Sequence, residues 1–584
     1  MTAKYTIDLL TQLPKFPLPQ LEETFARLKE WSTPLLGASE QEKLAEQTAD
    51  FNKSDALELQ SLLKQRWAET NANWLAPIVR HHYLVSRGPL QLTSNFALTV
   101  SAAELPDLDQ VKMAAKLLQN VADQYLAYVT EKAPVETNSK NEPIDMTAYH
   151  LFFRTQRRPG IDHDFLQQTR STVTNVEATI IYHQTLYQIR LIDHAGRVST
   201  LHSLTEALNE ILQNSATDSF FVGAYTGLPR DTALNSWQQL TTNKLNRDNL
   251  TRISNSLLVL TLEDAEHPLT AQSAFFGSLD KIAEKTFQIT VDANANIGFT
   301  FEHSQIDQGP AIHLVDSVVA HLSQPADQWD SKGKPHYQQL EWQLDHYAKE
   351  ALAEAGHQNS ELANRLTAAS TNVPAFGSER LQAMDINPDA FIQIGLALAG
   401  YRATGGWRNI VETIPLRNFY QGRTEKVPTV TVEVKAFIEA FAAGQRDDAT
   451  RQLFDHAIDA HVERINLVQK GMGVTAHLLG LQEMMIQHGG EKPFPAAATF
   501  FNSDFLKQLT TAFFSTSNLS SKVVANFITA PTAPNGYAIY YNILKSQIRL
   551  TASSWLTNSF NAQELLTNIT EILNEIFAWL AAQK

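Results

Sequence analysis

The sequence predicts a layered fold of the α/β or α+β class, in which helices cover mixed β-sheets. Amphipathic helical patterns mix along the chain with short apolar runs of strand character, and several of these runs pair as antiparallel hairpins. The chain has 584 residues, enough for several domains or two large ones, and 43% of them are apolar, which is enough for sizeable cores.

The N-terminal part is expected to be mainly helical. Four large apolar residues recur at helical spacing behind a proline-rich stretch and share one face: Leu21, Phe25, Leu28 and Trp31. Residues 36–132 are predicted to be mostly helices. The polar stretch 131–143 that follows is predicted to be a surface loop.

Strand patterns dominate the next part of the chain. Apolar residues alternate with polar ones across residues 178–193 and 285–303, which predicts two β-hairpins, and the apolar run 255–264 predicts a buried strand. A third hairpin is predicted for residues 536–555.

Two further helices are predicted from their ends and faces. Asn387 is suited to an N-cap, Pro388 to the first helical position, and Asp389 to the positive end of the helix dipole. The residues that follow are apolar nearly all round, which predicts a buried helix. The C-terminal helix has one apolar stripe, formed by Leu565, Ile569, Ile572, Leu573, Ile576 and Leu580.

Composition excludes several classes of function. A net charge of −15, from 47 basic and 62 acidic residues, argues against a surface that coats nucleic acid. The absence of cysteine excludes disulfides, thiolate nucleophiles and cysteine-based metal sites. Neither a secretory signal, a peroxisomal address nor a membrane span is expected, so we predict a monomeric cytoplasmic enzyme.

One histidine ends an alternating apolar run. His303 follows Phe299 and Phe301 at every second position, and Asp307 comes four residues later. A general base needs an imidazole whose pKa is near its ordinary value of about 6.5 and one ring nitrogen held by a partner. Asp307 is suited to hold that nitrogen, although a lone histidine at a strand end is more often structural than catalytic.

Other candidate sites are weaker. The hydroxyls of Ser515, Thr516 and Ser517 are suited to stabilising an oxyanion, or to forming a polar loop. The stretch 418–426 contains a Gly-Arg pair that suits an anion site or a surface turn. Four histidines lack the spacing of metal ligands: His81, His82, His461 and His477.

Taken together, these stretches resemble the choline/carnitine acyltransferase family. The resemblance extends over nearly the whole chain, with ten stretches in the family's order: LPKFPLPQLEETFARL, NWLAPIVRHHYLVSRGPLQLTSNFAL, YHLFFRTQRRPGIDHD, VGAYTGLPRDTALNSWQQL, FEHSQIDQGP, NPDAFIQIGLALAGYR, FYQGRTE, HLLGLQ, FFSTSNLSS and APNGYAIYYN. No single stretch decides the matter, but their number and order make a chance match improbable.

The resemblance implies an α/β fold of two chloramphenicol-acetyltransferase-like sandwich domains with mixed sheets. One domain is discontinuous and comprises residues 1–85 and 345–584. The other comprises residues 86–344 and carries the catalytic histidine. A tunnel between the two domains is expected to admit acyl-CoA from one side and the acceptor alcohol from the other.

The resemblance also implies a mechanism. His303 matches the family's general base and Asp307 its orienting acid. The base takes the proton of the acceptor hydroxyl, whose oxygen attacks the acyl thioester. Ser517, at the end of the Ser515–Thr516–Ser517 stretch, matches the serine beside the oxyanion. No covalent intermediate, metal or permanently bound cofactor is expected, and CoA or acyl-CoA is a co-substrate.

The acceptor site departs from the family pattern. Thr424 is retained, but Val411 and Ala476 stand where carnitine-using members have the Tyr and Arg that hold the substrate carboxylate. Thr529 replaces an aromatic residue that faces the trimethylammonium group. The acceptor is expected to be a small hydroxyl-bearing molecule. The alternatives are an inactive ligand-binding or regulatory homologue, and an acyltransferase for a different alcohol or an amine.

The CoA site departs in part. Ser378 and Gln382 stand where the family has two lysines for the 3′-phosphate, with Arg380 between them as a substitute. Asp389 matches the residue near the adenine. Asn518 replaces a glutamine beside the pantetheine arm.

The acyl pocket is expected to be short. Counting from Ser517 without a gap, Phe527 occupies the position where short-chain members of the family have Met and long-chain members Gly. A phenylalanine at this position obstructs the pocket, and a long acyl chain would have to displace its ring at a cost of about 1–3 kcal/mol. We therefore predict acetyl-CoA or another short acyl-CoA as the donor.

Overall fold

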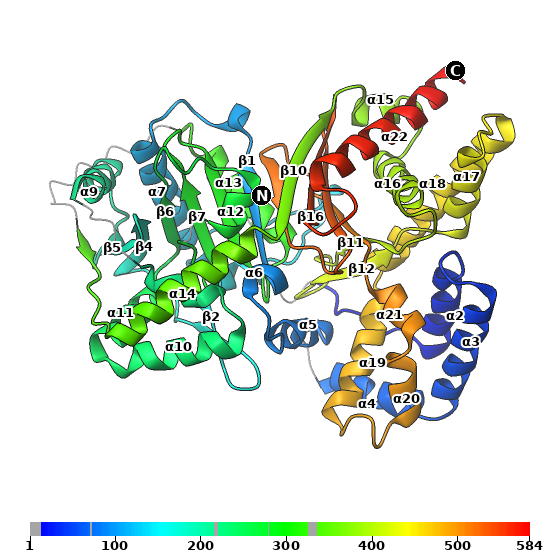
Figure 1. Ribbon diagram of the computed structural model, residues 1–584, viewed down its shortest axis with the longest axis horizontal. Helices are drawn as coiled ribbons and strands as arrows, with labels where there is room; N and C mark the ends of the chain where they lie inside the picture. The colour runs from blue at the N-terminus through cyan, green and yellow to red at the C-terminus, as the bar shows by residue number, and fades with distance from the viewer. Residues whose placement is uncertain (1–12, 70–72, 215–219, 278–279, 325–335, 584) are drawn as a thin grey trace. The chain divides into compact units, whose positions relative to one another are not determined.

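The computed structural model describes residues 13–69, 73–214, 220–277, 280–324 and 336–583 (Figure 1). Within them the chain forms two compact units. Unit 1 comprises residues 80–368 and 521–530, and unit 2 comprises residues 13–79, 369–520 and 531–583. The limits of these units differ from those predicted for the two domains, because the chain returns to unit 1 over residues 521–530. The domain limits themselves stay a prediction.

Unit 1 is built on an eight-stranded mixed sheet. In spatial order its strands are β14 (Val524–Ile528), β1 (Asn95–Val100), β8 (Ile297–Glu302), β7 (Phe287–Val291), β6 (Val259–Leu262), β4 (Val176–Tyr182), β5 (Thr185–Ile192) and β9 (Tyr337–Gln339). The pairs β4–β6 and β6–β7 are parallel and the other pairs are antiparallel.

The hairpins predicted in unit 1 are confirmed. β4 and β5 are joined by a two-residue turn in which His183 and Gln184 have positive φ angles of 47° and 64°, which matches the twist of the flanking strands. β7 pairs with β8 in the second hairpin. The apolar run 255–264 contains the fully buried strand β6.

The helices of unit 1 cover this sheet. α7 (Gln110–Val129) packs on β5, β6 and β7, and α13 (Gln308–Ala320) packs on α7 (Figure 1). The other elements are α6 (Leu90–Thr93), η1 (Ala102–Glu104), α8 (Tyr149–Phe152), β2 (Thr155–Arg158), β3 (Phe165–Gln168), α9 (Leu201–Asn214), η2 (Val222–Gly227), α10 (Arg230–Thr242), α11 (Lys244–Asn255), α12 (Ala271–Phe276) and α14 (His346–Ala363).

The expectation of a mainly helical segment at 36–132 missed one strand. β1 lies inside it and is buried at all six residues. A short apolar run that is buried on both faces has no alternation to distinguish it from a helical segment. The segment 131–143 contains no helix or strand, as predicted.

Unit 2 is built on a six-stranded mixed sheet. In spatial order its strands are β10 (Leu366–Val373), β16 (Ile548–Trp555), β15 (Tyr537–Ile543), β13 (Phe514–Asn518), β11 (Ile410–Pro415) and β12 (Thr424–Pro428). β13 lies near the centre and is parallel to both of its neighbours, β11 and β15. The predicted hairpin at 536–555 is confirmed as the antiparallel pair of β15 and β16.

Two predicted helices of unit 2 are confirmed. Asn387 caps α16 (Pro388–Thr404) by accepting hydrogen bonds from the backbone N–H groups of Asp389 and Ala390. α22 (Ala562–Ala582) packs on α16 and β16 (Figure 1). The other helices are α2 (Leu21–Ser32), α3 (Ala38–Lys53), α4 (Ala56–Glu69), α5 (Leu75–Leu84, which continues into unit 1), α15 (Ser378–Gln382), α17 (Val432–Ala442), α18 (Asp448–Gln469), α19 (Thr475–Gln487), α20 (Pro495–Phe501) and α21 (Asp504–Thr510).

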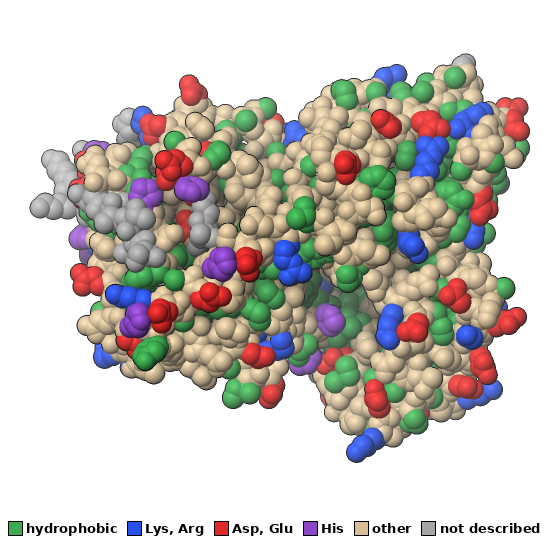
Figure 2. Space-filling view, viewed as in Figure 1, with side chains coloured by type: hydrophobic (Ala, Val, Ile, Leu, Met, Phe, Trp, Pro, Cys, Tyr) green, Lys and Arg blue, Asp and Glu red, His purple; other side chains and the backbone are tan. Residues whose placement is uncertain are grey.

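Two features of the structure relate to the sequence predictions about charge and membrane spans. Figure 2 shows Lys and Arg side chains interspersed with Asp and Glu side chains on the displayed face. In the described part of the chain, no helix combines the length and apolarity needed to cross a membrane.

Two glycines flanking β11 provide a matched test of packing. A Cβ on Gly422, in the loop between β11 and β12, would lie 1.9 Å from the carbonyl oxygen of Leu416, whereas a Cβ on Gly406 would meet no atom within 4 Å. We therefore expect Gly422→Ala to destabilise the protein by about 1–3 kcal/mol, because backbone must move, and Gly406→Ala to change stability by less than about 1 kcal/mol.

The midpoints of urea unfolding measure both effects, since a chain with two units need not unfold in one step. Equal midpoints for the two variants would contradict the geometry of this loop.

Candidate active site

His303 directly follows β8 in unit 1. Its backbone N–H donates to the carbonyl of Ser94 at 3.0 Å. Its ring packs against Tyr83, with 5.0 Å between centroids, and meets Phe96 edge-on at 5.3 Å. The side chain is 25% exposed. The imidazole is therefore held by two aromatic rings and remains partly accessible.

The hydrogen bond of the ring defines its tautomer. Nδ1 of His303 lies 2.6 Å from the carbonyl oxygen of Ile306, and because a carbonyl only accepts, Nδ1 carries the proton. In the neutral ring, Nε2 then has the lone pair. Asp307 Oδ1 is 3.5 Å from the same Nδ1, so the main-chain carbonyl is the closer acceptor, and the orienting role of Asp307 remains a prediction.

A fully buried arginine lies behind the histidine. Arg157 donates to Asp164 at 2.7 Å, to Glu302 at 3.2 Å and to the carbonyl of Tyr83 at 2.8 Å. Glu302 also accepts from the hydroxyl of Ser94 at 2.7 Å. Glu302, the residue before His303, therefore belongs to one polar network with Tyr83 and Ser94.

The network extends through a second buried arginine. Arg230 donates to Asp164 at 2.6 Å and to Glu284 at 2.7 Å, and Arg87 lies 3.0 Å from Asp164. The sequence stretches that contain these arginines contribute to the family resemblance but predict no role for them. The available signal was an arginine-rich strand-like segment, RTQRR, next to a Pro-Gly turn.

Phe527 is placed in the same unit as His303. Its ring stacks on Phe96 at 5.1 Å, Phe96 stacks on Phe301 at 5.2 Å, and Phe301 stacks on Phe287 at 5.3 Å. These four rings come from β14, β1, β8 and β7, and we call them the aromatic ladder. Phe527 is 2% exposed, and the ring on which it stacks touches the imidazole of His303.

The candidate oxyanion residues lie on β13 of unit 2. Ser517 is 1% exposed and its hydroxyl donates to the carbonyl of Thr413 at 3.3 Å. Thr516 donates to the carbonyl of Val411 at 3.0 Å and accepts from Gln393 of α16 at 2.9 Å. Because strand side chains alternate, Ser515 and Ser517 share the face opposite to Thr516. Thr516 therefore connects β13 to its covering helix.

A buried glutamate joins two of the predicted acceptor residues. Glu425, next to Thr424, accepts from the N–H of Ala476 at 3.0 Å and from the hydroxyl of Thr475 at 3.2 Å. Its second oxygen has no hydrogen-bond partner, and burial raises the pKa of the carboxyl to about 7. Two other predicted acceptor positions lie elsewhere. Val411 pairs with Pro428 at the far end of the β11–β12 hairpin from Thr424, and Thr529 follows β14 in unit 1.

The predicted CoA residues are only partly brought together. Asn518 donates to Asp389 at 3.1 Å. Arg380, on α15, is exposed, with its guanidinium 4.7 Å from the centroid of the Phe577 ring, and it donates to the carbonyl of Ala375. Its phosphate role stays a prediction.

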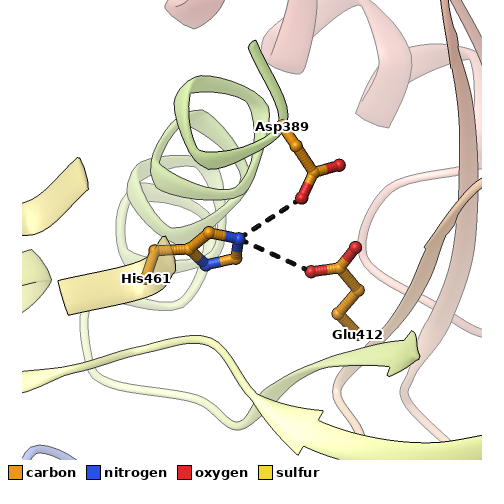
Figure 3. A group of neighbouring side chains, drawn as sticks. All are labelled: Asp389, Glu412 and His461. Atoms are coloured by element: carbon orange, nitrogen blue, oxygen red, sulfur yellow. Dashed lines mark hydrogen bonds and ion pairs between the residues drawn. The ribbon is translucent and has the colours of Figure 1, made fainter. Parts of the chain in front are cut away.

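His461, which lacks the sequence spacing of a metal ligand, lies near two carboxylates in the fold. His461 Nε2 lies 3.3 Å from Asp389 Oδ2 and 3.7 Å from Glu412 Oε2 (Figure 3). The three residues come from α18, α16 and β11, so only the fold reveals their proximity. His477, by contrast, is structural, because its nitrogens are bonded to Thr24 and Gln60 at 2.7 Å each.

Comparison with known proteins identifies the class. The model of the family described as Choline/Carnitine o-acyltransferase matches residues 16–571, which defines this protein as an acyltransferase. The chain belongs to the choline/carnitine O-acyltransferase family.

Several relatives resemble the chain over most of its length. It is 24% identical to carnitine O-acetyltransferase of Columba livia, covering 93% of this chain and 89% of the relative. It is 24% identical to choline O-acetyltransferase of Gallus gallus (96% and 91%) and 25% identical to peroxisomal carnitine O-octanoyltransferase of Rattus norvegicus (94% and 93%). Among solved structures, the wax ester synthase/diacylglycerol acyltransferase from Marinobacter aquaeolei VT8 matches with a TM-score of 0.36 and 10% identity, over 88% of this chain and 100% of that one.

The buried carboxyl of Glu425 predicts a pH dependence of stability. Its pKa rises from an ordinary value of 4.5 to about 7, so the unfolded state ionises first. Between about pH 4.5 and 7 this residue should lower the free energy of unfolding by roughly 3 kcal/mol, and the loss should level off above pH 7. Glu425→Gln should remove this component of the slope.

Urea unfolding at several pH values measures the slope, with Glu433→Gln as the control because Glu433 is an exposed glutamate on α17 of the same unit. The same slope in Glu425→Gln as in the wild type would contradict the burial of an ionisable carboxyl here.

Proposed function

We propose that the protein transfers a short acyl group between coenzyme A and the hydroxyl of a small molecule, with His303 as the general base. The observation that carries this proposal is the bond from His303 Nδ1 to the Ile306 carbonyl. It leaves Nε2 as the basic nitrogen of a ring that is packed on two sides and partly exposed.

The chemistry is proton transfer followed by acyl transfer. Nε2 takes the proton from the acceptor hydroxyl, and the oxygen attacks the thioester carbonyl. The tetrahedral oxyanion collapses, the CoA thiolate leaves, and the imidazolium returns its proton to the thiolate. Asp307, 3.5 Å from Nδ1, stabilises the imidazolium. By the family resemblance, Ser517, whose hydroxyl donates to the Thr413 carbonyl in unit 2, is the residue assigned to the oxyanion.

The acceptor is a small alcohol whose recognition does not depend on a carboxylate. The printed names of the relatives are those of carnitine and choline acyltransferases, and this supports an alcohol of similar size. Val411 and Ala476, both buried and apolar, stand where carnitine-using members hold a carboxylate. The donor is acyl-CoA, with Asp389 and Asn518 as part of its site.

The His303 assignment predicts loss of turnover without loss of fold. With acetyl-CoA and a panel of small alcohols, the wild type should release CoA thiol, and His303→Ala should lower kcat/KM by about 10²–10⁴-fold. His321→Ala is the matched control, because His321 is an exposed histidine that caps α13 in the same unit.

The same assay distinguishes the proposed acyltransferase from an inactive ligand-binding homologue. Absence of thiol release with every acceptor, combined with a thermal shift on adding CoA, would support an inactive ligand-binding homologue and would refute the proposed enzyme. Release that is unchanged in His303→Ala would refute the assigned base.

The aromatic ladder predicts acyl-chain preference. Phe527 is stacked and buried, so a long acyl chain would have to displace a fixed ring at a cost of about 1–3 kcal/mol. Phe527→Gly should therefore shift the ratio of kcat/KM for octanoyl-CoA over acetyl-CoA upward by about tenfold or more.

Phe287→Ala is the control, because it removes a ring from the far end of the ladder and tests whether general loosening changes the preference. A wild type that uses palmitoyl-CoA as well as acetyl-CoA would show that Phe527 does not limit the pocket.

A further inference from the structure

Unit 2 contains a cluster of one histidine and two carboxylates that the proposed reaction does not use as a cluster. Figure 3 shows Asp389 from the first turn of α16, Glu412 from β11 and His461 from α18 pointing toward one another. Each contributes one ligand-type atom, and these atoms lie within 4.8 Å of one another. His461 and Glu412 are 2% and 3% exposed. We propose that Asp389, Glu412 and His461 bind one divalent transition-metal ion such as Zn²⁺.

The two distances from His461 to the carboxylates are long for hydrogen bonds and fit a shared ion. His461 Nε2 is 3.3 Å from Asp389 and 3.7 Å from Glu412, whereas charge-assisted hydrogen bonds are about 2.7–2.9 Å long. A single Nε2–H also cannot serve two acceptors well. Ligand atoms about 2.1 Å from a zinc ion are separated by roughly 3.3–3.7 Å at tetrahedral to trigonal angles.

In each carboxylate, the outer oxygen, which is the one not paired with His461, has polar neighbours of its own. Asp389 Oδ1 accepts from Asn518 at 3.1 Å and from Tyr541 at 2.8 Å, and Glu412 Oε1 lies 3.3 Å from the same tyrosine hydroxyl. The inner oxygen of Glu412, Oε2, is buried without a hydrogen-bond partner. Outer partners of this kind orient carboxylates in metal sites and leave the inner oxygens for the ion.

The charge of the cluster also favours a cation. Two carboxylates this close repel each other, and within the described residues their ion pairs are those with His461 alone. A buried cluster of this net charge is costly unless a proton or a metal ion neutralises it. A metal ion satisfies all three inner atoms at once, which a single proton on His461 or on a carboxylate does not.

The donor set selects the kind of ion. One imidazole nitrogen and two carboxylate oxygens suit Zn²⁺ or Mn²⁺, whereas Mg²⁺ prefers oxygen ligands alone. The side chain of Asp389 is 26% exposed, which gives the ion a route of entry and leaves a fourth position for water. Bound metal would join α16, β11 and α18, and would therefore stabilise the fold of unit 2.

The experiment measures metal binding directly and is independent of acyl transfer. Chelator-treated full-length protein is titrated with Zn²⁺, and then with Mg²⁺, by calorimetry. We expect one equivalent of Zn²⁺ to bind with micromolar or tighter affinity, to raise the melting temperature by on the order of 3 °C, and to be bound far more tightly than Mg²⁺.

Two variants and one control decide the outcome. Glu412→Gln and Asp389→Asn each keep the shape of the side chain and remove one charge, and each should weaken Zn²⁺ binding at least tenfold. If Glu412→Gln does not fold, the Zn²⁺ affinity of Asp389→Asn decides the outcome. His267→Ala should bind as the wild type does, because His267 pairs with Asp264 at the surface of unit 1. No binding by the wild type, or equal affinity in the wild type and both variants, would overturn the site.

Discussion

The geometry around His303 depends on one buried carboxylate. Asp164 is fully buried and accepts hydrogen bonds from three arginines, Arg87, Arg157 and Arg230, at 3.0, 2.7 and 2.6 Å. These residues come from distant parts of the chain, and each would be costly to bury alone. Because every charge in the group needs the others, the segments that carry them have one arrangement, and the strand that ends at His303 is part of it.

The histidine lies where this polar network meets an apolar one. On the polar side, Arg157 fixes Glu302, the residue before His303. On the apolar side, the aromatic ladder runs across four strands, and one of its inner rings, Phe96, meets the imidazole edge-on. A close-packed aromatic layer has few alternative packings, and a buried ion-pair network has fewer. The ring orientation, with Nδ1 on the Ile306 carbonyl, follows from both constraints.

Local features of this fold could be predicted from the sequence, and non-local ones could not. The three hairpins and the N-cap of α16 depend on residues close together in the chain, and they are confirmed. The pairing of β14 with β1 joins residues more than four hundred positions apart, so the sequence did not predict that Phe527 would stack on Phe96. His461 failed the test of ligand spacing for the same reason, since its partners lie on other elements. The catalytic assignment of His303 came from alternation combined with family resemblance, because spacing alone left a structural role open.

Unit 2 also contains a buried polar network, which is built on a tyrosine and a glutamine instead of arginines. Tyr541 is fully buried, and burial raises its pKa, so its hydroxyl stays protonated and donates toward Asp389. It accepts from Gln393, which also donates to Thr516 on β13. A continuous chain of hydrogen bonds therefore connects the carboxylate cluster to the strand that carries Ser515 and Ser517. In both units, a buried polar network is bonded to the strand that carries or precedes the candidate catalytic side chains. Such networks hold a site more rigidly than a loop does, because each bond in a low-dielectric interior is costly to leave unmade.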